Sequence, residues 1–131
     1  MKEKVWVYDI EQLKNFHSIT AYCPYNQDIK TFIIHNEVNQ LEEYVQFLLN
    51  DCEIMIGYNN INYDYPLLHF ILTNYKRWKN YPTYKILQLL YDKSQEIIES
   101  EYSSIPQKNV KIKQVDLYRI HHFDNKNRRT S

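Results

Sequence analysis

The sequence predicts a single α/β domain in which a central sheet of about five strands packs against flanking helices. Two observations predict this class: short segments with apolar side chains at every second position, and longer segments with apolar side chains at helical spacing. The chain has 131 residues, which is the size of one domain. The expected order along the chain is three strands, a helix, a strand, two helices and a last strand.

Residues 5–10, 17–22 and 29–34 are the first three predicted strands, because each is rich in β-branched and aromatic residues with period-two alternation. In the first of them, Asp9 falls on the same face as Val7. The turn sequence CPYNQD separates the second strand from the third. We therefore expect an antiparallel unit of three strands, with a carboxylate on a face where core is expected.

Residues 38–49 are predicted to form a helix, with Asn36 or Asn39 as its cap. The apolar residues of 53–58 form the next predicted strand. A crossover of about a dozen residues is what a parallel pairing requires. This strand should therefore add to the antiparallel unit by parallel pairing.

Asp64 and Pro66 mark the start of the next helix, because aspartate caps helices well and proline is tolerated in a first turn. A further helix is predicted from Thr83 to about residue 100. Residues 108–117 alternate lysines with apolar residues and form the last predicted strand. No repeat or low-complexity linker interrupts this order.

Composition narrows the class of protein. Sixteen basic and sixteen acidic residues cancel, so net charge neither indicates nor excludes a nucleic-acid partner. No apolar run approaches the roughly 20 residues of a membrane span, and the first ten residues lack the apolar region of a secretory signal. Cys23 and Cys52 lack a metal-type spacing and are predicted to be reduced thiols. We expect a cytoplasmic protein that does not bind membranes.

Three carboxylates carry the predicted chemistry. Asp9 and Glu11 are two residues apart at the end of the first strand, so their side chains leave one face about 7 Å apart. Asp64 follows the neighbouring parallel strand and can reach the same place. Carboxylates so placed repel each other unless a cation lies between them, and Mg²⁺ or Mn²⁺ prefers such oxygen ligands. Two ions about 4 Å apart would support hydrolysis of a phosphodiester.

Each of these residues also has a simpler interpretation. A D-x-E pair is usually a solvated strand end, and an isolated aspartate before a helix is usually a cap. Three asparagines near Asp64 are ordinary turn formers, namely Asn59, Asn60 and Asn62. Gly57, the only glycine of the chain, fits a positive φ or a close approach. His121, His122 and Asp124 have no clear metal spacing. The hypothesis of a metal site therefore depends on the occurrence of Asp9, Glu11 and Asp64 together.

The two segments that carry these three carboxylates resemble motifs of a known family. VYDIE, followed some 45 residues later by IGYNNINYDYPLL, resembles the first two motifs of the DEDD superfamily of 3′-to-5′ exonucleases, which have a ribonuclease-H-like fold. The second motif is most similar to exonuclease domains of phage and other viral DNA polymerases. The resemblance covers nearly all of the chain. It implies a ribonuclease-H-like mixed sheet and a metal-dependent nuclease that proofreads at a single-stranded DNA 3′ end, in host cytoplasm if a phage encodes it.

The resemblance also implies residue roles. Asp9 would contact both metal ions, Glu11 one of them, and Asp64 the second, partly through water. Asn60 would lie near the 3′-terminal nucleotide. The segment VDLYRIHHFDNKNRRTS resembles the strand and basic stretch that follow the second motif, in which the aspartate of the DL pair, here Asp116, is usually structural.

The third motif of the family, a tyrosine or histidine four or five residues before a last aspartate, is absent from this chain. The family carries it on a final helix. Three explanations stay open: a truncated domain, a split gene whose partner supplies the rest, or a degenerate domain that binds without cutting. The alternative function is thus a catalytically incomplete module that binds nucleic acid or protein. Its basic C-terminal residues would track phosphates, and self-association or a polymerase or other partner chain would cover an exposed sheet face. These basic residues include Lys126, Arg128 and Arg129.

Overall fold

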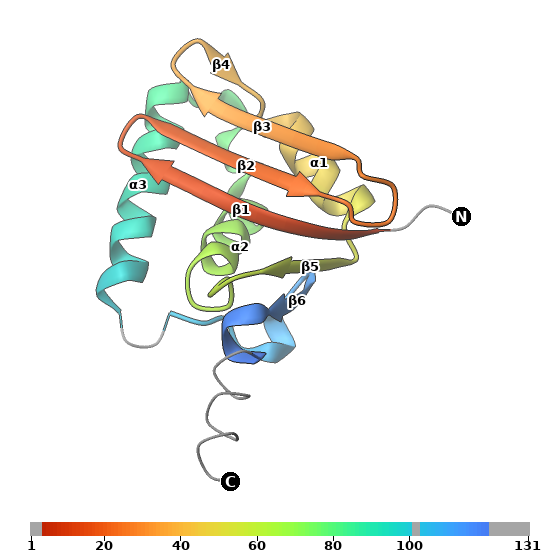
Figure 1. Cartoon of the computed structure of the whole chain (residues 1–131). Coiled ribbons are helices and arrows are strands. Elements are labelled where there is room, and N and C mark those ends of the chain that lie inside the picture. The colour runs from red at the N-terminus through yellow and green to blue at the C-terminus, as the bar shows by residue number, and fades with distance from the viewer. Residues whose placement is uncertain (1–3, 101–102, 121–131) are drawn as a thin grey trace, which may run out of the picture.

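A six-stranded mixed sheet forms the centre of the molecule (Figure 1). The computed structural model describes residues 4–100 and 103–120. The strands lie in the order β4-β3-β2-β1-β5-β6. Their bounds are β1 (Val5–Leu13), β2 (Phe16–Tyr22), β3 (Ile29–His35), β4 (Val38–Asn39), β5 (Ile54–Gly57) and β6 (Lys113–Asp116).

The pairing of the strands divides the sheet into two parts. The first four strands form an antiparallel meander, whereas β5 pairs parallel with β1 and β6 pairs parallel with β5. The described residues thus confirm a mixed α/β domain with an antiparallel unit extended by parallel strands. The sixth strand is the short β4, which the sequence pattern did not predict.

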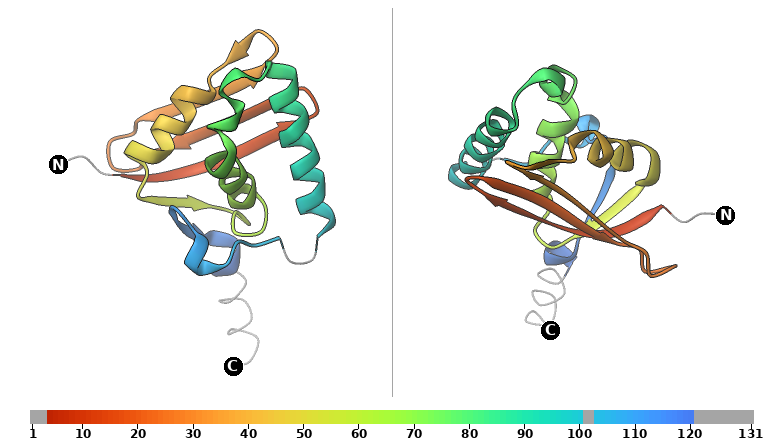
Figure 2. Two further views of the ribbon diagram at one scale, coloured as in Figure 1. Left: turned by 180° about the vertical axis from the view of Figure 1, so that it is seen from behind. Right: turned by 90° about the horizontal axis from the view of Figure 1, so that it is seen from above.

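Three helices cover one face of the sheet: α1 (Leu41–Asp51), α2 (Asp64–Asn74) and α3 (Thr83–Glu99). All three lie on the same side (Figure 2). Residues 117–120, directly after β6, are also helical. Two short 3-10 helices, η1 (Arg77–Asn80) and η2 (Gln107–Asn109), lie in the connections. The core is therefore a single layer between the sheet and the helices.

Alternation along β1 decides which of its side chains enter that core. Trp6, Tyr8 and Ile10 are buried on the helix side, as period two requires. The Trp6 ring meets the Phe47 ring of α1 edge-on, with centroids 4.9 Å apart. Residues Val7, Asp9, Glu11 and Leu13 are exposed on the opposite face.

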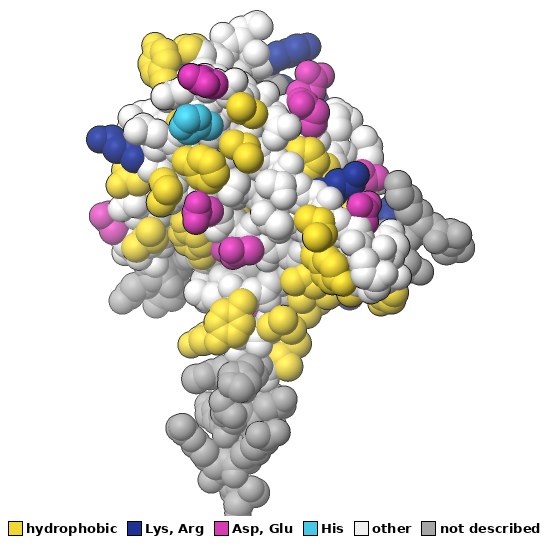
Figure 3. Space-filling view, turned by 45° about the horizontal axis from the view of Figure 1, so that its top comes forward, with side chains coloured by type: hydrophobic (Ala, Val, Ile, Leu, Met, Phe, Trp, Pro, Cys, Tyr) yellow, Lys and Arg dark blue, Asp and Glu magenta, His cyan; other side chains and the backbone are white. Residues whose placement is uncertain are grey.

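The sheet face opposite α1, α2 and α3 is arranged in rows set by the strand register. Asp9 lies beside Thr20 of β2, which lies beside Thr31 of β3, and all three are exposed. Apolar rows flank the polar centre, formed by Val7, Tyr22 and Ile29 at one end and by Leu13 with Phe16 at the other. Acidic side chains accordingly lie among hydrophobic ones on this side of the molecule (Figure 3).

Several predicted bounds were wrong. The predicted helix at 38–49 starts only at Leu41, because Val38 and Asn39 pair with β3 instead. Its N-cap residue is Gln40, although Asn39 Oδ1 accepts the N–H of Leu41 at 3.0 Å. The predicted strand at 108–117 is reduced to β6, because β5 offers only four residues for pairing.

A buried histidine belongs to the core. His17 donates from Nδ1 to Gln12 Oε1 at 2.6 Å and accepts at Nε2 from the Tyr44 hydroxyl at 2.8 Å. Burial lowers the pKa of His17 to about 3. The ring is therefore neutral near pH 7 and serves as a packed hydrogen-bonding unit.

Two predictions from composition can be compared with the structure. Cys23 and Cys52 are both free and buried, which confirms the prediction of reduced thiols. Within the described residues, no helix has the length and apolar character that crossing a membrane requires.

Candidate functional site

Asp9 and Asp64 come together where β1 runs past the end of β5. The parallel pairing joins Val5–Val7 to residues 54–56, so the next stretch of β1 has no strand on that side. Asp64 Oδ2 accepts the N–H of Ile10 there, at 3.3 Å. The side chain of Asp64 thus hydrogen-bonds to the edge of β1 just beyond the residues that pair with β5.

Asp64 and Pro66 were predicted to mark the start of a helix, and α2 does begin at Asp64. The reason given, that aspartate caps the helix, was wrong. The N-cap of α2 is Tyr63, and no side chain caps this helix. The carboxylate is directed to β1 and not to the first helical N–H groups. The presence of an aspartate at position 64 is therefore explained by its hydrogen bond with Ile10 and not by the preference of aspartate for helix caps.

The surroundings of Asp64 make its negative charge costly. Only 6% of the residue is exposed. Burial raises the pKa of Asp64 most, and the negative charges of Asp9 and, less strongly, Asp116 raise it further, whereas the hydrogen bond from Ile10 lowers it. The resulting pKa is about 7, against an ordinary value of 3.8. A carboxylate in this state binds either a proton or a cation.

No basic side chain in the described residues neutralises this charge. The ion pairs in residues 4–100 and 103–120 join Lys30 to Asp28 and Lys93 to Glu96. Carboxylate oxygens are ligands that Mg²⁺ and Mn²⁺ prefer. The donor chemistry at Asp9 and Asp64 therefore fits a divalent cation.

Glu11 is less closely tied to this pair. It is exposed on the open face of β1, two residues beyond Asp9, and it lines a shallow hollow with Lys14, Phe16 and His35 at the end of the β1–β2 hairpin. Among the described residues, no group of three or more histidine, cysteine, aspartate or glutamate side chains is placed to hold a metal ion. The structure thus brings together two of the three predicted ligands.

Asp116, at the end of β6, holds the turn that leads to Asp64. Its carboxylate accepts three backbone N–H groups: Oδ1 accepts from Asn59 at 2.8 Å and from Tyr118 at 2.9 Å, and Oδ2 accepts from Ile61 at 3.2 Å. Asp116 is 4% exposed. The structural role that the resemblance implies for the DL aspartate agrees with these contacts.

Gly57 is required by a close approach. Its φ is not positive, but a Cβ at this position would lie 2.8 Å from both Cβ and Cγ of Asn60. The Asn60 side chain therefore occupies the space in which a side chain at residue 57 would stand. Of the two explanations open for the only glycine of the chain, the structure supports packing. Positive φ occurs instead at Asn59, at 58°.

Asn60 is completely buried and connects β1 to β6 across that glycine. Its Nδ2 donates to Gln114 Oε1 at 2.8 Å, and the Tyr8 hydroxyl donates to the same oxygen at 2.6 Å. Its Oδ1 has no hydrogen-bond partner in the described residues. In this conformation Asn60 presents no surface to a nucleotide, so the predicted nucleotide contact stays a prediction.

Sequence reasoning missed Tyr8 and Gln114, because neither is charged: Tyr8 lies inside the VYDIE segment, where only the carboxylates were considered, and Gln114 directly precedes the VDLYRI segment. Their only signal is position: Tyr8 directly follows Val7, which pairs with Ile56, and Gln114 pairs with Met55 on the next strand. Several candidate residues lie outside the described residues, namely His121, His122, Asp124, Lys126, Arg128 and Arg129.

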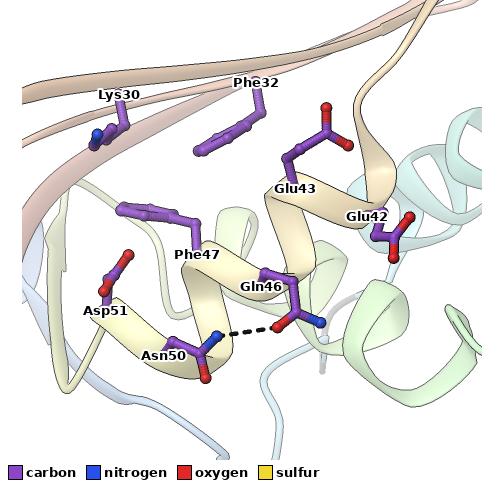
Figure 4. Close-up of a pocket in the computed structure, with 8 residues that line it drawn as sticks. All are labelled: Lys30, Phe32, Glu42, Glu43, Gln46, Phe47, Asn50 and Asp51. Carbon is purple, nitrogen blue, oxygen red and sulfur yellow. Dashed lines mark hydrogen bonds between the residues drawn. The ribbon is translucent and has the colours of Figure 1, made fainter.

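Another hollow lies between β3 and α1 (Figure 4). Phe32 and Phe47 line it with ring centroids 5.3 Å apart, and Glu43 and Asp51 are also among its lining residues. None of the predicted site residues lines it. It is therefore separate from the Asp9 and Asp64 carboxylates.

Comparison with protein-family models, with curated proteins and with solved structures found no match to this chain. Its function has to be argued from its own residues.

Proposed function

We propose that this chain is a ribonuclease-H-like exonuclease domain, or the N-terminal part of one, that removes nucleotides from a DNA 3′ end with Mg²⁺ or Mn²⁺. The observation that supports this best is the position of Asp64, buried beside Asp9 with no basic partner in the described residues. Asp9 lies on β1, and Asp64 begins the helix that follows β5, the parallel neighbour of β1, as the resemblance to DEDD exonucleases implies. The order of the strands is compatible with that fold.

The roles of the residues follow from their positions. Asp9 and Asp64 would hold the metal ions, with Glu11 completing the set after a change of its exposed side chain. The bound ions would supply an activated water and stabilise the leaving oxygen. Asp64 is held by Ile10 at one end and by the anchored turn at the other, so its oxygen is positioned before a metal binds.

Metal binding can be tested without activity. Mn²⁺ should raise the melting temperature of the wild-type protein, because a ligand that binds only the folded chain stabilises it. The shift should disappear in Asp9→Asn and Asp64→Asn. Glu96→Gln, at an exposed helical position, is the matched control and should keep the shift. A wild-type protein with no shift at millimolar Mn²⁺ would argue against the metal site.

Cleavage is tested with a 5′-labelled single strand of DNA and Mn²⁺. We expect weak laddering from the 3′ end, because the chain lacks the third motif and with it a ligand and a base. The products should disappear in Asp9→Ala. Laddering that persists in this variant would point to a contaminating nuclease.

A second candidate is a binding module that does not cut, and two observations favour it. The described residues hold no group of three metal-ligating side chains, and the sheet face opposite α1, α2 and α3 carries exposed apolar side chains, including Tyr22 and Ile29. For nucleic acid, binding should fall steeply with added salt and be unchanged in Asp9→Ala. Replacing Lys126, Arg128 and Arg129 by alanine should flatten that salt dependence.

For a protein partner, light scattering is the direct measurement. The wild type should self-associate, and Tyr22→Lys should reduce the association without changing the circular dichroism spectrum, because it places a charge on the exposed face. Tyr25→Lys, in the β2–β3 turn and also exposed, is the control. A wild type that is strictly monomeric would count against this face as an interface between copies.

A further inference from the structure

Two exposed tyrosines lie against each other at the end of the sheet that carries the candidate carboxylates. Tyr58 directly follows β5 and is 61% exposed, and Tyr118 comes two residues after β6 and is 39% exposed. Their rings meet edge-on with centroids 5.3 Å apart. Because β5 and β6 are adjacent and parallel, the residues that follow them emerge at the same edge.

One buried carboxylate fixes both backbones. Asp116 accepts the N–H of Tyr118 and also the N–H of Asn59, the residue after Tyr58. The pair is therefore attached to a rigid part of the molecule and not to two independent loops. Asp116 Oδ2 also accepts the N–H of Ile61 at 3.2 Å, three residues before Asp64, so the pair and the candidate site share one anchored turn.

A guanidinium group stands beside the rings in the sequence and is tied to the same turn. Arg119 is exposed, and its Nη2 donates to Asn62 Oδ1 at 3.3 Å. The hydroxyl of Ser103 donates to the carbonyl oxygen of Asn62 at 2.7 Å, which braces this side of the turn. Aromatic faces with an adjacent arginine are the combination that stacks on bases of any sequence and neutralises the phosphate between them.

We propose that Tyr58, Tyr118 and Arg119 form a stacking platform for the bases of a single-stranded nucleic acid whose end reaches Asp9 and Asp64. This rests on the proposed function and names the part of the chain that would hold its substrate. Such a platform binds bases by stacking and does not discriminate between base types. It would supply binding that the fully buried Asn60 does not offer in this conformation.

The test is binding of a single-stranded DNA that carries 2-aminopurine near its 3′ end, in EDTA so that nothing is cleaved. Stacking on a tyrosine quenches the fluorescence of 2-aminopurine. The double variant Tyr58→Ala with Tyr118→Ala should lose the quench and bind about 5- to 150-fold more weakly, the range for loss of one stacked base. Tyr58→Phe with Tyr118→Phe keeps the rings and should restore both. Tyr84→Ala, on α3 and 70% exposed, is the matched control and should change neither.

The results separate this proposal from the proposed function. Laddering by the wild type with no quench, or a quench that survives in the alanine variant, would overturn the platform and leave the exonuclease in place. A quench that needs the tyrosine rings, without laddering in Mn²⁺, would support the platform and count against the enzyme. Dissociation of a complex between copies in the alanine variant, with DNA binding unchanged, would assign the pair to a protein interface and overturn the proposal.

Discussion

Two buried aspartates lie at the same end of the sheet, and their surroundings are opposite. Asp116 accepts three backbone N–H groups, whereas Asp64 accepts one, at 3.3 Å. The charge of Asp116 is thus used to hold the polypeptide, and the charge of Asp64 is left largely unsatisfied beside Asp9. Burial alone therefore does not mark a candidate ligand; a shortage of donors around a buried carboxylate does.

The largest effect is expected from Asp116→Ala. It leaves three N–H groups without an acceptor, and hydrogen bonds to charged groups contribute about 1.5–3 kcal/mol each. The free energy of unfolding, measured by urea denaturation, should fall by about 5 kcal/mol, which is close to the total for many domains. Asp116→Asn keeps one acceptor oxygen and should cost less. Full stability of the alanine variant would contradict the anchoring role.

Asp64→Asn should act in the other direction. The amide keeps an oxygen for the N–H of Ile10 and removes the buried charge. In EDTA at pH 8 the variant should unfold with a higher free energy than wild type, by a gain that the pKa shift places on the order of 4 kcal/mol. A variant less stable than wild type under these conditions would show that the charge is satisfied after all.

The pH dependence of that gain has a definite sign. Folding raises the pKa of Asp64 from 3.8 to about 7. The folded chain therefore binds more protons than the unfolded chain inside this window, so Asp64 makes the wild type lose stability as the pH rises through it. The gain in Asp64→Asn should be near zero at about pH 4 and largest above about pH 7. His17, with its lowered pKa, contributes the opposite trend to both proteins, and the difference between them isolates Asp64.

Gly57→Ala tests the packing that lies between the two aspartates. The added Cβ would stand 2.8 Å from Asn60, and overpacking of this kind costs about 1–3 kcal/mol. Combining it with Asn60→Gly removes the obstructing atoms. The double variant should then lose less stability than the sum of the two single variants, as a double-mutant cycle measures. Additive losses would mean that another contact excludes the side chain.

The smallest effect is expected from Arg119→Ala. This residue contacts the same turn as Asp116 but from an exposed position. Surface substitutions usually change stability by no more than about 0.5 kcal/mol. Thermal unfolding should therefore be nearly unchanged even if binding of single-stranded DNA is lost. A large fall in stability would show that the turn depends on its exposed contact as much as on its buried one.

Much of the fold could be predicted because alternation and helical spacing are local properties. The strand at β1, the helix at α3 and the parallel crossover into β5 all followed from such patterns. The bounds that were wrong depend on partners far along the chain. Val38 and Asn39 became a strand because β3 was available, and β6 is short because β5 is short.

In the candidate site, too, local features could be predicted and particular contacts between distant residues could not. Asp9, Glu11 and Asp64 could be named from the sequence because a D-x-E pair and an aspartate before a helix are visible in it, although β1 extends to Leu13 and places Asp9 and Glu11 inside the strand, not at its end. The parallel strands also predicted that Asp64 can reach Asp9. The contact of Asp64 with Ile10 could not be predicted, since it spans 54 residues and depends on where β5 stops. The packing of Asn60 on Gly57 was likewise one of two explanations until the backbone was known.

The anchoring of the turn by Asp116 also has a consequence for biosynthesis. Asn59 and Ile61 precede their acceptor by 57 and 55 residues. A ribosome makes the segment that carries Asp64 long before it adds the residue that fixes this segment. The nascent chain therefore passes through a stage in which its candidate ligands exist but are not held, and the turn before Asp64 is fixed only after β6 has been synthesised.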